Sequence, residues 1–148
     1  MSSDKQVTKD LIETLEDGKN GFAAAAEKLV ESDRSELASK FREYSSQRGQ
    51  FAAELRSLAA DYGDDIKESG SVGAAVHRGW MAVKDAATGS DAGAVLEVAE
   101  QGEDHAVAEY TRALDNEEIS IDLRDVIQRQ YASVKAAHDE VRTLRDSN

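Results

Sequence analysis

The sequence predicts an all-α fold: a four-helix bundle with a short extra helix between the second and third long helices. Three observations support this prediction. The 148-residue chain contains no proline. Four long stretches repeat apolar residues at three- and four-residue intervals, which is the spacing of one helix face. Each stretch is interrupted near its middle by glycine or a polar residue, so the interruptions would meet at one level of a bundle.

The first two stretches form a predicted helical hairpin. The first helix should run from about Asp4 to about Glu31, and the second should run to about Tyr62, with a turn at Ser32–Asp33 between them. Their apolar stripes are Val7, Leu11, Leu15, Gly18, Phe22, Ala25 and Leu29 in the first helix, and Leu37, Phe41, Tyr44, Arg48, Phe51, Leu55, Leu58 and Tyr62 in the second.

A second hairpin is predicted in the C-terminal half of the chain. The third long helix should begin at Ser90–Asp91 and end near Asp115, and the fourth should begin after Asn116 or Ser120. The stripes are Val95, Ala99, Gly102, Ala106, Tyr110 and Ala113 in the third helix, and Leu123, Ile127, Gln130, Val134, Ala137, Val141 and Leu144 in the fourth.

The middle of the chain decides the topology. A polar loop at 63–70 precedes a short helix over about 72–88, in which Val76 and Trp80 should pack on the bundle. A helix of about 17 residues is roughly 25 Å long, so it can return the chain along the bundle. The second and third long helices would then be parallel. Four long helices with one long crossover form the ferritin-like arrangement.

The interruptions of the stripes predict a central polar layer. In an antiparallel hairpin, residues at equal distances from the turn face each other. This places Gly18 opposite Arg48 in the first hairpin, and Glu103 opposite Gln130 in the second. The expected members of the layer are Asp17, Gln47, Arg48, Glu103 and Gln130.

Arg48 is the residue whose role most needs explaining. A buried cation must be paired, and a guanidinium can donate to two carboxylates. We expect Arg48 to point inward and bond Asp17 or Glu103, with Gln47, Gln130 and Glu100 completing the hydrogen bonds. This layer would fix the register of the helices. The alternative is that Arg48 extends along the stripe to solvent.

A metal centre is the competing interpretation of the layer. Di-iron bundles use a lone Glu from each of two helices and Glu-x-x-His from the other two. Here the second helix offers Gln47-x-x-Gln50 and the fourth offers Gln130-x-x-Ser133, whose amides and hydroxyl suit iron poorly. Only Asp17, Glu100 and Glu103 remain as weak metal candidates. We therefore expect no cofactor, with iron or another divalent metal as the alternative.

The three histidines do not change this expectation. His77 should pack against the bundle, and His105 should be exposed in an acidic stretch. His138 lies two turns beyond Gln130, so we expect it to be too far along the helix to join the central layer.

Composition limits the partners and the compartment. The net charge is -12, and it is spread along the chain. An acidic protein lacks the basic footprint that binding to nucleic acid or anionic lipid requires. The chain has no cysteine, no apolar run approaching the roughly 20 residues that span a bilayer, and no signal-peptide pattern. We expect one cytoplasmic domain over residues 1–148 that binds neither nucleic acid nor membrane.

Several short motifs resemble one protein family. They are Leu11–Gly18 (LIETLEDG), Gly21-Phe22, Gln47-Arg48, Phe51–Leu55 (FAAEL), Gly70–Gly73 (GSVG), His77–Met81 (HRGWM), Glu100–Asp104 (EQGED), Tyr110, Gln130-Tyr131 and Ala137–Asp139 (AHD). With them the chain resembles the DUF2383 family of bacterial ferritin-like proteins of uncharacterised function. The resemblance implies a four-helix bundle and no particular activity.

Two functions remain from the sequence. The first is a non-catalytic ferritin-like bundle with a structural or interaction role, in a stress-related setting by analogy with the family. It is compatible with a homodimer or with another protein partner, neither of which the sequence specifies. The alternative is a metal-binding ferritin-like protein, either a di-iron oxidoreductase or an iron store.

Overall fold

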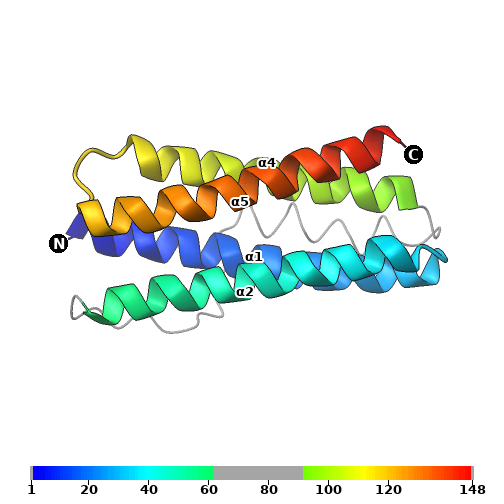
Figure 1. Cartoon of the computed structure of the whole chain (residues 1–148), viewed down its shortest axis with the longest axis horizontal. Coiled ribbons are helices and arrows are strands. Elements are labelled where there is room, and N and C mark those ends of the chain that lie inside the picture. The colour runs from blue at the N-terminus through cyan, green and yellow to red at the C-terminus, as the bar shows by residue number, and fades with distance from the viewer. Residues whose placement is uncertain (1, 62–91, 148) are drawn as a thin grey trace.

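The computed structural model describes residues 2–61 and 92–147, and nearly all of them are helical (Figure 1). The helices are α1 (Ser2–Glu31), α2 (Ser35–Asp61), α4 (Ala92–Asp115) and α5 (Ile121–Asp146). The predicted all-α four-helix bundle is confirmed, and the helix ends lie close to the expected ones. The short helix predicted over 72–88, with His77, Val76 and Trp80, falls outside the described residues.

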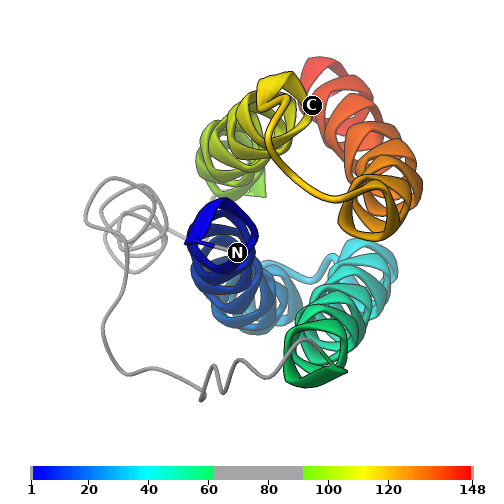
Figure 2. The same ribbon diagram turned by 90° about the vertical axis from the view of Figure 1, so that its left-hand side faces the viewer.

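The four helices form two antiparallel hairpins, α1 with α2 and α4 with α5. Followed along the chain in Figure 1, α2 and α4 run in the same direction, as the predicted crossover requires. Viewed end-on, the helices surround a common axis (Figure 2). α1 packs against both α2 and α4, whereas α5 packs closely on α4 and only sparsely on α2.

The two hairpins close through different turns. Between α1 and α2 the backbone closes the turn, because Arg34 donates its N–H to the Leu29 carbonyl at 2.8 Å and Asp33 adopts a left-handed φ of 63°. Aspartate tolerates this conformation better than most residues. Between α4 and α5, side chains hold a longer loop. Arg124 donates to the carbonyls of Leu114 and Asn116, both at 2.7 Å.

The N-terminus of α1 is tied to the second hairpin. Asp4 accepts a hydrogen bond from the backbone N–H of Ser120 at 2.9 Å. Ser120 in turn caps α5 by accepting from the Leu123 N–H at 3.3 Å. This satisfies one of the N–H groups that a helix start leaves without a partner. The contact fixes one end of the bundle.

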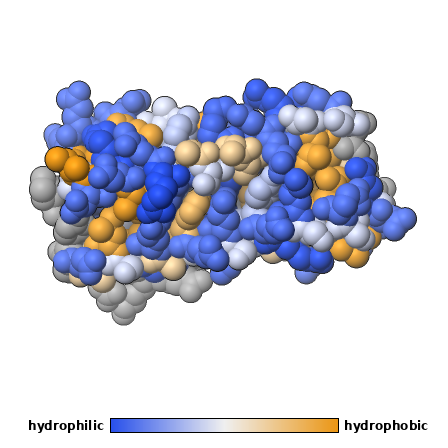
Figure 3. All heavy atoms as spheres, in the orientation of Figure 1, coloured by the Kyte–Doolittle hydropathy of each residue, from blue (hydrophilic) through white to orange (hydrophobic). Residues whose placement is uncertain are grey.

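The apolar core lies in two parts along the bundle. One part surrounds Phe22 and Phe41, whose rings meet edge to face at 5.2 Å between centroids. The other surrounds Leu15, Leu55 and Ile127. The face seen in Figure 3 is mainly hydrophilic, with smaller hydrophobic patches between the charged side chains. A polar level separates the two core parts, and it contains the candidate site.

Candidate functional site: a buried arginine–glutamate pair

Arg48 of α2 and Glu103 of α4 form a bidentate ion pair inside the bundle. Nη1 and Nη2 of Arg48 donate to Oε1 and Oε2 of Glu103, each at 2.6 Å. The side chains are 1% and 0% exposed, respectively. Arg48 therefore points inward, as the sequence predicts, and does not extend to solvent. Paired N–H donors matched to two carboxylate oxygens make this one of the stronger kinds of hydrogen-bonded contact.

The first hairpin is shaped around the guanidinium. Gly18 of α1 lies opposite Arg48, and a Cβ atom at Gly18 would sit 3.3 Å from Nη1. A larger side chain would therefore compete with the guanidinium for space. The guanidinium carbon also lies 5.2 Å from the centroid of the Phe22 ring, within the range of a cation–π contact. Gly18 thus leaves space for the guanidinium, and Phe22 provides an aromatic ring with which the guanidinium interacts favourably.

Asp17 is buried near this level, but it does not pair with Arg48. Within the described residues no hydrogen bond joins them, and Oδ2 of Asp17 lacks a partner although the residue is only 6% exposed. Burial, reinforced by the negative charge of Glu13 one turn earlier, raises the pKa of Asp17 to about 6. Of the two partners expected for Arg48, the structure thus shows Glu103 and not Asp17. A bidentate pair with Glu103 already uses both terminal nitrogens.

Gln130 also lies elsewhere than predicted. It accepts from the Tyr110 hydroxyl at 2.7 Å and donates to Oε1 of Glu54 at 2.7 Å and to the Phe51 carbonyl at 3.3 Å. The expected pairing of Glu103 with Gln130 was wrong. The reason is the loop over 116–120, which delays the start of α5 and shifts the register by about two turns.

His138 occupies the position that the sequence assigned to Gln130. Its Nε2 lies 2.6 Å from Oδ1 of Asp104, the residue after Glu103. The expectation that His138 lies too far along α5 for the central level was therefore also wrong, and for the same reason. His105 is half-buried rather than exposed.

Gln47 and Glu100 do not reach the ion pair. Gln47 is half-buried and lines a cavity of about 230 Å³ between α2 and α5, and its Oε1 lacks a hydrogen-bond partner. Glu100 faces α5, where the Nε atom of Arg145 lies 2.9 Å from its Oε2. This contact is an ion pair without hydrogen-bond geometry, because the same oxygen has no hydrogen bond.

The donor set does not fit a metal ion at this level. Both oxygens of Glu103 are engaged by Arg48, and Glu100 is oriented toward arginine side chains of α5. A divalent cation would have to displace a guanidinium of the same sign. Among residues 2–61 and 92–147, no three histidine or carboxylate side chains are grouped so that they could hold a metal ion.

A second polar contact, which the sequence did not predict, joins α2, α4 and α5. Burial raises the pKa of the Tyr110 phenol, so it stays a donor to Gln130. Burial alone would raise the pKa of Glu54, but hydrogen bonds from Arg129 and Gln130 outweigh it and lower that pKa. The sequence contained two signals for this contact, an aromatic residue in the stripe of α4 (Tyr110) and a polar residue in the stripe of α5 (Gln130). It did not show the register of α5 against α4, which brings the two residues together.

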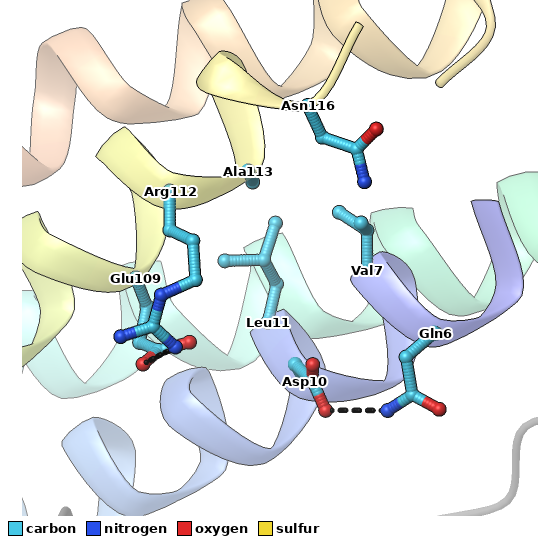
Figure 4. A pocket seen from close by; sticks show the side chains of 8 residues that line it. All are labelled: Gln6, Val7, Asp10, Leu11, Glu109, Arg112, Ala113 and Asn116. Carbon is cyan, nitrogen blue, oxygen red and sulfur yellow. Dashed lines mark hydrogen bonds and ion pairs between the residues drawn. The ribbon is translucent and has the colours of Figure 1, made fainter. Parts of the chain in front are cut away.

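A cavity between α1 and α4 lies away from both polar contacts. It has a volume of about 460 Å³ and separates the N-terminal part of α1 from the C-terminal part of α4. In Figure 4, Leu11 points toward Ala113 across it, and Val7 points toward Asn116. The polar groups on its rim bond to one another within each helix, as Gln6 does to Asp10 and Arg112 to Glu109. They therefore present no converging charges to a ligand.

The fold and this site define an all-α four-helix-bundle protein with a buried ion pair at its centre. The chain belongs to the DUF2383 family, described as "Domain of unknown function (DUF2383)", which matches residues 6–116. The matched region contains Arg48 and Glu103 and ends just after α4, so α5 with Gln130 and His138 lies beyond it. No match was found among the curated proteins.

Proposed function

We propose that this protein is a non-catalytic, ferritin-like bundle with a structural or interaction role, in which the Arg48–Glu103 pair replaces a metal centre. The main observation that supports this proposal is the bidentate pair, whose side chains are 1% and 0% exposed. In a di-iron bundle, carboxylates at mid-height surround metal cations. Here the guanidinium supplies the positive charge, so the carboxylate is neutralised without a metal.

The pair is better suited to specifying a structure than to adding stability. A buried ion pair loses hydration that its Coulomb attraction only partly repays, but a single unpaired member is strongly unfavourable. The arrangement therefore favours the one packing of α2 against α4 in which both charges meet. A bundle whose centre enforces one register is a rigid scaffold for binding at its surface.

The charge of the chain supports the expectation that its partners are not nucleic acids. The net charge of -12 opposes contact with phosphate backbones. None of the described helices combines the length and apolarity needed to cross a bilayer. A cytoplasmic location and a homodimer or another protein partner belong to this proposal as expectations.

One observation favours the alternative, a metal-dependent oxidoreductase or an iron store. Asp17 is buried with an unpaired carboxylate oxygen, which a cation could satisfy. Glu13, on the same helix, is the carboxylate whose charge raises its pKa. In the described part of the chain, no three histidine or carboxylate side chains are grouped so that they could hold a metal ion. This geometry offers fewer ligands than an iron site requires.

Metal content separates the two functions. The full chain is purified from medium supplemented with iron or zinc, and bound metal is measured by mass spectrometry together with iron-dependent oxygen consumption. We expect substoichiometric metal in the wild type and no change in Glu103→Gln. About two ions per chain, lost in Glu103→Gln or Asp17→Asn but kept in the exposed control Glu117→Gln, would establish the metal-binding alternative.

A further inference from the structure

The cavity between α2 and α5 brings together polar side chains from two helices that otherwise touch little. α2 and α5 lie side by side but pack only sparsely (Figure 1 and Figure 2). The cavity has a volume of about 230 Å³. The described residues that line it are Tyr44 and Gln47 of α2, and Ser133, Ala136, Ala137 and Glu140 of α5. Alanine and serine side chains are too short to fill the space between the helices, so the cavity stays open.

Gln47 places a buried hydrogen-bond acceptor at this cavity. Its Oε1 atom is buried, and no donor among the described residues reaches it. A buried carbonyl oxygen normally has a donor, because leaving water without finding another partner is unfavourable. The neighbouring Arg48 does not supply one, because both of its terminal nitrogens are bound to Glu103. The Gln47 oxygen can therefore accept from a ligand that brings N–H groups.

Glu140 adds a carboxylate to the same cavity. Its Oε1 accepts from the Tyr44 hydroxyl and lies 3.0 Å from Nζ of Lys40. The Lys40 and Glu140 side chains are 37% and 43% exposed, so this ion pair is a weak contact that another cation can replace. Among the described residues that line the cavity, none is positively charged. Amide, carboxylate and hydroxyl oxygens all accept hydrogen bonds, so the lining is suited to a cation that donates them.

The core holds the aromatic wall of the cavity in place. The Tyr44 ring packs against Phe22 and Phe41, with centroid distances of 5.3 and 6.0 Å. These contacts fix the position of the ring whose hydroxyl bonds Glu140. A ligand would therefore meet a wall that is already ordered, which lowers the entropy lost on binding.

We propose that this cavity binds the ammonium group of a small alkyl amine. The ammonium donates to Oε1 of Gln47 and replaces Lys40 at Glu140, while the methylene groups of the amine lie against the alanines of α5. An ammonium group has three donors and no acceptor, which matches a lining of oxygen atoms. The net charge of -12 also attracts cations to the molecule. This site is separate from the Arg48–Glu103 pair and does not depend on the structural role proposed above.

Isothermal titration calorimetry of the full chain with 1,4-diaminobutane tests the site. The titration is done in about 0.15 M salt, where exposed charges are screened beyond about 8 Å. We expect saturable binding of one amine per chain. The neutral analogue 1,4-butanediol should bind about tenfold more weakly, because hydrogen bonds from a charged donor are stronger. Gln47→Leu should weaken amine binding about tenfold, whereas Gln50→Leu, at an exposed glutamine of the same helix, should not.

The carboxylate and its present partner provide a second set of variants. Glu140→Gln should weaken amine binding, and Lys40→Gln should strengthen it because the competing cation is removed. Glu117→Gln, at an exposed carboxylate of the α4–α5 loop, should have no effect, which separates the cavity from general surface charge. Nα-acetyl-lysine methylamide serves as a second probe. Tighter binding of this probe than of the diamine would assign the ammonium to a protein side chain, and weaker binding would assign it to a free amine.

NMR locates the site without relying on any variant. On titration with the diamine, the side-chain amide signals of Gln47 and the ring signals of Tyr44 should shift, and the amide signals of Gln50 should stay in place. Three results would each overturn the proposal: no saturable binding of the diamine, equal affinity for the diamine and the diol, or equal affinity of Gln47→Leu and Gln50→Leu for the diamine.

Discussion

The two hairpins of this bundle differ in how their turns are closed, and the difference controls what each can bury. The α1–α2 turn is short and closed by backbone hydrogen bonds. The turn therefore fixes the register of α1 against α2, and Gly18 lies opposite Arg48. The α4–α5 connection is longer and held by the Arg124 side chain. That loop shifts α5, which brings His138 to the central level and moves Gln130 away from it.

The hairpins also differ in the kind of polar group that they place in the core. The first provides a charge, Arg48, which finds its partner on the second hairpin. The second supplies the Glu103 carboxylate of that pair and also buries a neutral contact, in which the Tyr110 hydroxyl donates to Gln130. Losing one member of a buried ion pair costs more than losing one neutral hydrogen bond. Variants at the two sites should therefore rank in that order.

The largest effect is expected from removing the guanidinium. Arg48→Ala leaves Glu103 buried and unpaired, which should lower the free energy of unfolding by about 3–5 kcal/mol in urea denaturation. Arg48→Met should cost less at low pH, where an unpaired Glu103 with a pKa raised by burial can protonate. The exposed Arg129→Ala serves as control and should cost under about 1 kcal/mol. Equal losses in the two alanine variants would contradict a buried pair.

The next effect concerns pH and Asp17. Its pKa is raised from 3.8 to about 6, so the folded state prefers the protonated carboxyl. Wild-type stability should therefore fall as the pH rises through this interval. Asp17→Asn should remove that fall and be more stable at neutral pH by about 2 kcal/mol. Glu13→Gln should act in the same direction but less strongly. An Asp17→Asn profile parallel to the wild type would refute the argument.

A smaller loss is expected in the second hairpin. Tyr110→Phe removes the hydroxyl and leaves Oε1 of Gln130 without its donor, which should cost about 1–2 kcal/mol. Tyr44→Phe, which removes a more exposed hydroxyl bonded to Glu140, provides the comparison and should cost less. Thermal unfolding of both variants measures the difference. A Tyr110→Phe cost as large as that of Arg48→Ala would erase the distinction between charged and neutral sites.

The smallest effect compares two glycines of the first hairpin. At Gly49, an added Cβ would meet only the flexible Lys19 side chain at 3.4 Å, so Gly49→Ala should stabilise the helix by about 0.5–1 kcal/mol. At Gly18 the same atom would press on the buried Arg48, which cannot move freely. Gly18→Ala should therefore gain less or lose stability in the same denaturation assay. Equal gains would show that the guanidinium has spare room.

Sequence periodicity was sufficient for the helices and for the first hairpin. An apolar stripe determines which face is buried, and a short turn leaves little freedom in register, so the inward Arg48 beside Gly18 could be anticipated. Glu103 could be named only as one of two partners, because a stripe does not reveal which carboxylate points at the guanidinium.

The second hairpin exceeded what periodicity can determine. A stripe repeats every seven residues, so two helices shifted by two turns match almost as well as in the correct register. The choice depends on the hydrogen bonds of the connecting loop, such as those of Arg124 to Leu114 and Asn116. The misplacement of Gln130 and His138 follows from that single unknown.

The bidentate pair also has a consequence for how this chain can change through mutation. A lineage that lost Arg48 first would carry a lone buried carboxylate, and one that lost Glu103 first would carry a lone buried cation. Either single step is costly, whereas exchanging both for apolar residues can be nearly neutral. We therefore expect these two positions, 55 residues apart, to change together. A stepwise route from this bundle to a metal-binding one would pass through a chain with one buried, unpaired charge, which is less stable.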